Sequence, residues 1–223
     1  MSLREEQLER MRRDWDERAR KNARHFVNTS RSDWSDEEFF ASGEKAIAED
    51  ILTDTINICQ GKDPKAMRVL EIGCGAGRLT RALANLFGEV HAVDVSGEMI
   101  AQARLALADR PNIHLYCNNG CDLSVLPSVE FDFAYSAIVF QHIPSREIIE
   151  NYVREVGRLL RPGGLFKFQV QGNVSVHSDP RDTWVGVSYS EEQARALGLS
   201  CVFEPRYMHG AGNQYFWLWF FKT

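Results

Sequence analysis

Several features that mark other classes of protein are missing from this sequence. No apolar run approaches the roughly 20 residues needed to span a bilayer, and the first residues, MSLREE, contain no apolar segment typical of a secretory signal. The five cysteines are an odd number without metal-ligand spacing, which favours free thiols in a reducing compartment. We therefore expect a cytoplasmic protein without a membrane segment.

Metal-ligand spacing is also missing among the histidines. No pair of them has a separation typical of a zinc site. The histidines concerned are His25, His91, His114, His177 and His209. We therefore expect no bound metal.

A surplus of basic charge is absent as well. The 223 residues include 26 Lys and Arg against 31 Asp and Glu, for a net charge of −5. A nucleic-acid surface needs a basic stripe to displace counterions, so we expect no nucleic-acid partner. With 44% hydrophobic residues and no internal repeat, the chain can build one substantial α/β core. The oligomeric state stays open.

The stretch RVLEIGCGAGRLT, from Arg68 to Thr80, carries the clearest motif. An apolar strand over residues 69–72 leads into glycines at the alternate positions 73, 75 and 77, and a helical pattern begins at Arg78. A strand, a glycine-rich turn and a helix open a nucleotide-binding βαβ unit. Because glycine has no Cβ, the backbone can bend sharply there and approach a ligand closely.

A second expected strand ends at Asp94, 21 positions after Gly73. An acidic residue at about this distance accepts hydrogen bonds from ribose hydroxyls. Arg78 stands where a dinucleotide fingerprint has its third glycine, and Glu71 precedes the turn, where a carboxylate favours a cation over a pyrophosphate. S-adenosylmethionine joins an adenosine to positive sulfonium and ammonium groups, so we expect it as the cofactor.

Three motifs follow one another at plausible spacing: VLEIGCGAGRLT, VHAVDVSGEMI and FDFAYSAIVFQHI. They resemble the class I S-adenosylmethionine-dependent methyltransferases, above all small bacterial methyltransferase-domain proteins, from about residue 67 to the C-terminus. The resemblance implies a Rossmann-like α/β fold with a seven-stranded, mostly parallel sheet, an antiparallel C-terminal strand, helices on both faces and an N-terminal helical cap. We expect the cap at residues 1–64 and the methyltransferase domain at residues 65–223.

The glycine turn and the ends of the second, third and fourth strands are expected to hold the cofactor. The expected cofactor-binding residues are Glu71, Gly73, Cys74, Gly75, Asp94, Val95, Met99, Asn119, Gly120, Cys121, Ser136 and Ala137. Glu71 either binds backbone amides or approaches the positive methionine end, and Met99 either packs on adenine or lies in the core. Family members often have an acidic residue that meets the adenine at this point. Counting back from Phe131 puts Gly120 at that position, unless a two-residue gap puts Asp122 there. The adenine contact therefore stays open among residues 119–122.

The N-terminal segment, residues 4–24, is densely charged but carries a narrow apolar stripe at helical spacing that includes Met11 and Trp15. One interpretation is a helix simply docked on the domain. The other, implied by the resemblance, is a lid in which Trp15 and Phe26 form an aromatic wall over the ligand.

Local signals predict several further elements. Ser35 and Glu38 have the spacing of a capping box at a helix start, and a helix is expected over residues 44–59. Later strands are expected at residues 165–170, 199–206 and 215–221, with a long loop at residues 172–186 that could shape a substrate pocket.

Methyl transfer from a sulfonium mainly requires that the nucleophile be held in line with the S–CH3 bond. A base is needed only where the nucleophile must lose a proton. His142 follows the fourth strand and is the candidate base, with a structural hydrogen bond as the alternative. We expect a methyltransferase that acts on a small-molecule acceptor and releases S-adenosylhomocysteine.

The substrate signal comes partly from absent motifs. The fourth strand ends in SAIV, residues 136–139, and not in the Asn-Pro-Pro-Tyr type of sequence found in base N-methylases, and no Pro-Cys nucleophile is present. Both absences favour a small molecule over DNA. Two alternatives are a non-catalytic cofactor-binding module and a nicotinamide-dependent oxidoreductase, although Arg78 in place of a glycine counts against the latter.

Overall fold

The computed structural model describes residues 3–176 and 178–223, so the expectation for His177 lies outside the described residues. Within these ranges, a seven-stranded sheet has the order β3-β2-β1-β4-β5-β7-β6. The strands are β1 (Arg68–Ile72), β2 (Glu89–Asp94), β3 (Ile113–Cys117), β4 (Phe131–Ser136), β5 (Leu160–Val170), β6 (Phe203–His209) and β7 (Phe216–Lys222). The first five are parallel, and β7 pairs antiparallel with β5 and β6. The expected Rossmann-like sheet is confirmed.

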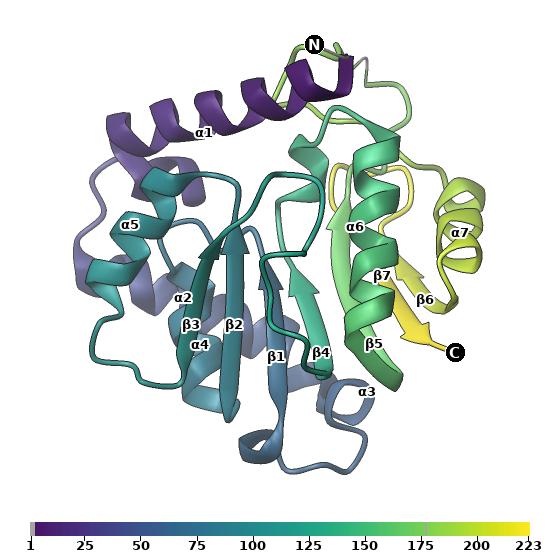
Figure 1. Cartoon of the computed structure of the whole chain (residues 1–223), viewed down its shortest axis with the longest axis horizontal. Helices are drawn as coiled ribbons and strands as arrows, with labels where there is room; N and C mark the ends of the chain where they lie inside the picture. The colour runs from purple at the N-terminus through teal and green to yellow at the C-terminus, as the bar shows by residue number, and fades with distance from the viewer. Residues whose placement is uncertain (1–2, 177) are drawn as a thin grey trace.

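Helices lie on both faces of this sheet, with α6 in front and α2 and α4 behind in Figure 1. Their bounds are α1 (Leu3–Val27), α2 (Asp36–Asp50), α3 (Thr55–Cys59), α4 (Arg78–Leu86), α5 (Gly97–Ala106), α6 (Arg146–Leu159) and α7 (Glu191–Ser200). The alternation of side chains along each strand gives two cores. Leu70 packs in the core that contains α6, whereas Val69 packs in the core that contains α4.

Serine side chains fix the starts of several helices. Ser35 accepts from the backbone N–H of Glu38, and the Glu38 carboxylate accepts from the Ser35 N–H, so the expected capping box is confirmed. Ser190 forms a second capping box at the start of α7, and the side chains of Ser96 and Ser145 accept from backbone N–H groups at the starts of α5 and α6. Each such cap contributes about 1 kcal/mol to its helix.

Three expected boundaries are wrong. The helix expected over residues 44–59 begins instead at Asp36, because the capping box starts it, and ends at Asp50 before a 3-10 turn and the short α3. Strand β5 begins at Leu160 and not at residue 165, because Leu160 pairs with Phe131 across an irregular register. Strand β6 begins at Phe203 because α7 extends to Ser200.

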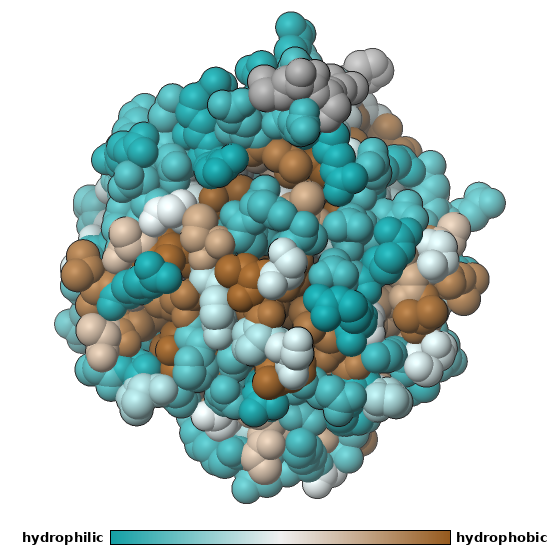
Figure 2. All heavy atoms as spheres, in the orientation of Figure 1, coloured by the Kyte–Doolittle hydropathy of each residue, from teal (hydrophilic) through white to brown (hydrophobic). Residues whose placement is uncertain are grey.

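Helix α1 crosses the edge of the sheet at which β1, β2 and β4 end (Figure 1). It changes direction at Asn22, whose backbone is extended (φ −173°, ψ 84°). In the same orientation, Figure 2 shows polar side chains over α1 and hydrophobic ones reaching the surface below it. Among the described residues, no helix combines the length and apolar composition that crossing a membrane requires.

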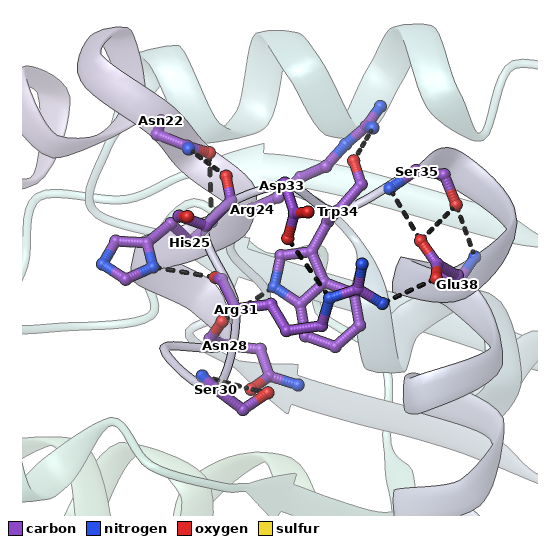
Figure 3. A network of polar contacts seen from close by, with 11 residues as sticks. Asn22, Arg24, His25, Asn28, Ser30, Arg31, Asp33, Trp34, Ser35 and Glu38 are labelled. Atoms are coloured by element: carbon purple, nitrogen blue, oxygen red, sulfur yellow. Dashed lines mark hydrogen bonds and ion pairs between the residues drawn. The ribbon is translucent and has the colours of Figure 1, made fainter.

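The segment after this change of direction is fastened to the start of α2 by a network of polar contacts (Figure 3). The Asn22 amide donates to the Ser32 carbonyl at 2.8 Å, and Arg24 donates to the Trp34 carbonyl at 3.0 Å. The Trp34 indole N–H donates to the Asn28 carbonyl at 2.9 Å. The junction is therefore held independently of the longer part of α1 that precedes Asn22.

Candidate cofactor and substrate pocket

A pocket lies between α1 and the carboxyl ends of β1, β2 and β4, where open α/β sheets bind ligands. Its empty volume, counted with the part open to solvent, is about 910 Å3. Eleven of the expected site residues line it: Trp15, Phe26, Glu71, Gly73, Cys74, Gly75, Asp94, Val95, Met99, Ala137 and His142.

The glycine turn forms the floor of the pocket. Gly73 and Gly75 have positive φ angles of 77° and 53°, which L side chains rarely adopt. A Cβ on Gly73 would lie 2.3 Å from Val139, and one on Gly75 would lie 2.5 Å from Val27. Both glycines therefore leave room for Val139 and Val27, which line the pocket beside the turn.

Asp94 is fixed at the end of β2 by backbone donors. Its Oδ2 accepts from the Gly75 N–H at 2.8 Å, and its Oδ1 accepts from the Ser96 N–H at 2.9 Å. Loss of hydration raises the pKa of this carboxyl to about 6, against the lowering by those two hydrogen bonds. Each oxygen keeps further acceptor capacity, so hydroxyl groups in the pocket would find a rigid acceptor.

Glu71 is a buried carboxyl with an unfilled acceptor. Its side chain is 2% exposed, and burial raises its pKa to about 7 although Arg78 is nearby. Its Oε2 has no hydrogen-bond partner among the described residues, and neither has Nε of Arg78. A buried polar atom without a partner is costly, so a cationic ligand beside Glu71 would relieve a cost present in the free protein.

Sequence reasoning missed a polar residue on the wall at the end of β3. Asn118 is 6% exposed, donates to the Tyr152 hydroxyl at 2.7 Å, and has no described partner for its Oδ1. The neighbouring Asn119, Gly120 and Cys121, which carry the adenine prediction, do not line the pocket. Asn119 instead holds its own turn by accepting from the Cys121 N–H at 2.9 Å. The adenine contact stays a prediction.

The other expected residue outside the wall is Ser136. It is fully buried, and its hydroxyl donates to the Ile72 carbonyl at 2.9 Å, which ties β4 to β1. The neighbouring Ala137 does reach the pocket.

Aromatic rings form another end of the pocket, here called the aromatic end: Trp15, Phe26 and His142 line it, and Trp184 packs against them without lining the pocket. The ring of His142 lies 5.3 Å from that of Trp15 and 4.9 Å from that of Trp184, between centroids. Phe26 meets Trp184 edge to face at 6.0 Å. Trp184 comes from the long loop after β5, so α1 and this loop build the aromatic end together. Trp34 instead packs on Phe39, away from the pocket.

His142 is held in one tautomer by its surroundings. Its Nδ1 lies 2.5 Å from the Trp184 carbonyl oxygen, which can only accept, so Nδ1 carries the proton and Nε2 is the free acceptor. The Gln141 amide nitrogen lies 3.3 Å from Nε2. Burial lowers the pKa of His142 to about 4, so the ring is neutral at pH 7.

Polar contacts fasten α1 to the loop that carries Trp184. Arg18 donates to the Thr183 hydroxyl at 2.9 Å, and that hydroxyl donates to Asp14 at 2.9 Å. The Arg18 guanidinium also lies 4.7 Å from the ring centre of Trp15 and 5.3 Å from that of Trp184, within cation–π range. Side chains of α1 and of this loop therefore hold the aromatic end together.

Residues 69–164 match a protein-family model described as "Methyltransferase domain". A ubiquinone biosynthesis O-methyltransferase from Xanthomonas oryzae pv. oryzae is 32% identical over 103 residues, which are 46% of this chain and 42% of that protein. A malonyl-[acyl-carrier protein] O-methyltransferase from Enterobacter lignolyticus is 34% identical over 137 residues, 60% of this chain and 51% of that protein. The chain thus spans about half the length of these curated relatives.

The fold is also found among solved structures. Magnesium protoporphyrin IX methyltransferase from Synechocystis PCC 6803, solved with bound S-adenosylhomocysteine, superimposes with a TM-score of 0.69 at 14% identity and covers 97% of this chain and 100% of its own. The family match thus assigns residues 69–164 to a methyltransferase domain, and the likeness to the solved structure shows that the chain shares its fold.

Proposed function

We propose that this chain, which carries a class I S-adenosylmethionine-dependent methyltransferase domain, transfers a methyl group from that cofactor to a small-molecule acceptor. The observation that carries the proposal is the pairing of two unlike ends in one pocket. At one end the acceptors of Glu71, Asp94 and Asn118 meet the glycine turn. At the other end, aromatic rings surround a neutral imidazole.

The residues at the first end fit the cofactor's functional groups. Asp94 would accept from the ribose hydroxyls, and the unpartnered Oε2 of Glu71 would accept from the ammonium group. Met99, which is buried at the wall, would pack on the adenine. Gly73 and Gly75 would let the backbone lie against the methionine part. When bound, the cofactor supplies an electrophilic methyl group on a positively charged sulfur.

The chain's contribution to the reaction is then mainly positioning. The aromatic end would hold the acceptor beside the glycine turn and exclude water from the space between them. No residue has to form a covalent bond with either reactant.

His142 would orient the acceptor's nucleophile. With Nδ1 donating to the Trp184 carbonyl, Nε2 can accept a hydrogen bond from an acceptor hydroxyl in place of the Gln141 contact. A base with a pKa of about 4 removes a proton poorly at pH 7. A hydrogen-bonding role therefore accords with its environment better than full proton removal.

The acceptor we propose is a hydroxyl or carboxyl oxygen on a compact molecule with an apolar body. Both curated relatives described above are named as O-methyltransferases, and Trp15 and Phe26, which line the pocket, would offer ring surfaces to such a body. The net charge of −5 disfavours a nucleic acid. The five free cysteines favour a reducing compartment such as the cytoplasm.

We also propose that α1, as part of an N-terminal cap over residues 1–64, is a lid on this pocket. Met11 and Trp15 line the pocket from the part of α1 that precedes Asn22, whereas the network around Arg24 and Trp34 anchors the segment after Asn22. The change of direction at Asn22 is therefore the natural hinge.

The test has two steps. Calorimetry with S-adenosylhomocysteine, using NADH as the matched control ligand, should give micromolar binding of the first and none of the second. Tight NADH binding without S-adenosylhomocysteine binding would overturn the cofactor assignment.

Incubation with methyl-labelled cofactor and a panel of hydroxylated and carboxylated aromatic compounds should then label a product. Binding without any labelled product, from the panel or from a metabolite extract, would indicate a non-catalytic module.

A further inference from the structure

Two histidines lie side by side on the face of the sheet that carries α6. In Figure 1, α6 lies in front of β5, and the segment between β3 and β4 passes in front of β1. Leu70, which packs in the core with α6, pairs in register with His91, and His91 pairs with His114. Because in-register neighbours in a parallel sheet project to the same face, both histidines lie on this face, His91 buried at 3% exposure and His114 with a side chain that is 42% exposed.

Three potential metal ligands converge there. Nε2 of His91 lies 2.8 Å and Nε2 of His114 lies 3.4 Å from the same carboxylate oxygen, Oε1 of Glu89. One ligand atom from each of the three residues lies within 4.8 Å of the others. In a tetrahedral zinc site with bonds of about 2.0–2.1 Å, ligand atoms are about 3.3 Å apart. The separations of 2.8 Å and 3.4 Å from Oε1 of Glu89 lie on either side of that value.

The outer contacts of this cluster are those that metal ligands require. The Tyr116 hydroxyl lies 3.0 Å from Nδ1 of His91, and Arg68 donates to Oε2 of Glu89 at 2.7 Å. The neutral His91 ring can place its proton on Nδ1, where the Tyr116 oxygen accepts it, leaving the Nε2 lone pair free. A second hydrogen bond of this kind orients a ligating histidine. Oε1 of Glu89 remains on the side of the two histidines.

We propose that Glu89, His91 and His114 form a binding site for one zinc ion, with water as the fourth ligand. Two imidazoles and one carboxylate are a donor set that zinc accepts. The residues stand on β2 and on the edge strand β3, so the ion would link the edge strand to its neighbour. The site is absent from the lining of the cofactor pocket, so it is separate from the proposed methyl transfer.

The separation along the chain explains why sequence reasoning expected no metal. Residues 89 and 91 supply two ligands only two positions apart, and the third comes from another strand. Alternate residues of a strand share a face, but the partner at His114 depends on the register of β2 and β3. The expectation of no metal was made from spacing alone.

Equilibrium dialysis of the full chain against Zn2+, followed by elemental analysis, tests the site. We expect about one zinc per wild-type chain and at least tenfold weaker binding in His114→Ala, which loses one of three ligands. His209→Ala is the matched control, since His209 stands exposed on the edge strand at the other side of the sheet, and it should bind like wild type. Equal binding by wild type and His114→Ala would overturn the proposal.

A cysteine could bind zinc by a different route, so Cys117→Ser is included. Cys117 is exposed on β3, and loss of zinc in this variant with retention in His114→Ala would contradict the proposed ligands. Tyr116→Phe keeps all three ligands but removes their outer contact, and should weaken binding about tenfold. At a hundredfold excess over its dissociation constant, zinc should raise the wild-type melting temperature by roughly 5–10 °C, with no rise in His114→Ala.

Discussion

The two ends of the pocket are built from different parts of the molecule. The cofactor end uses strand ends and the turn between β1 and α4, where backbone hydrogen bonds to Asp94 fix the geometry. The aromatic end uses α1 and the loop after β5, which are held to each other by side chains such as Arg18 and Thr183. The first end is preorganised by the sheet, whereas the second would separate without disturbing the sheet under the lid motion proposed above. Substitutions at the cofactor end should therefore act mainly on cofactor affinity, whereas those at the aromatic end should act mainly on the opening of α1.

The largest expected effect is on cofactor affinity when Asp94 is replaced. Charge-assisted hydrogen bonds contribute about 1.5–3 kcal/mol each, so Asp94→Ala should weaken S-adenosylhomocysteine binding at least about tenfold. Calorimetry measures this, with exposed Asp109→Ala as the control that should leave affinity unchanged. An unchanged dissociation constant in Asp94→Ala would mean that another residue holds the ribose.

Glu71→Gln should raise the stability of the free protein at high pH but weaken ligand binding. The folded pKa of Glu71, about 7, exceeds its ordinary value of 4.5, so the folded state binds more protons between these pH values. The stability this protonation gives is present below about pH 4.5 and is lost as pH rises through 7. Without ligand, Glu71→Gln should therefore be about 1–3 kcal/mol more stable than wild type at pH 8, and near parity at pH 5.

The same variant should bind S-adenosylhomocysteine about tenfold more weakly, because the ammonium group loses its carboxylate partner. Thermal melts at pH 5 and pH 8, together with calorimetry at pH 8, measure both effects. A variant that is less stable than wild type at both pH values would contradict the account of Glu71 as an unpaired buried acid.

The cofactor end was easier to predict from the sequence than the aromatic end, because most of its residues lie close together along the chain. Gly73, Gly75 and Asp94 belong to one βαβ unit, so their positions follow from spacing within about 20 residues. The wall residue Asn118 was missed because its signal is an unpartnered oxygen, which appears only when Tyr152 of α6 takes up its amide. Backbone periodicity carries no such information.

At the aromatic end, the sequence could not predict which rings contact one another. Trp15 and Phe26 fall on an N-terminal helix, yet their neighbour Trp184 lies more than 150 positions away along the chain, on a loop without periodicity. Their meeting depends on how α1 crosses the sheet. Element boundaries failed for a similar reason: β5 begins at Leu160 only because of its pairing with Phe131.

A smaller effect on affinity is expected when the chain is shortened to the hinge. Removing residues 1–21 takes away Met11 and Trp15 but leaves the junction at Asn22, so S-adenosylhomocysteine should bind roughly fivefold more weakly and product formation should fall further. Calorimetry and a methylation assay measure the two. If α1 is only a docked helix, the melting temperature will drop while the dissociation constant stays the same.

The last comparison concerns the contacts between α1 and the loop after β5, and its measured quantity is the opening of α1. Arg18 bonds Thr183 and lies over two tryptophan rings, which together contribute about 1–2 kcal/mol. Arg20 makes an exposed ion pair with Glu98 at 3.0 Å, and such pairs contribute about 0–1 kcal/mol. Arg18→Ala should therefore raise opening of α1 about tenfold and Arg20→Ala less than about fivefold.

Hydrogen exchange of residues 8–21 is the measurement, with and without S-adenosylhomocysteine. Exchange should be faster in Arg18→Ala than in wild type, nearly unchanged in Arg20→Ala, and slowed in each by the ligand, because ligand contacts bias the closed state. If ligand leaves the exchange of these residues unaltered in wild type, α1 does not close over the pocket. If both variants exchange alike, the joint formed by Arg18, Trp15 and Trp184 does not hold the helix down.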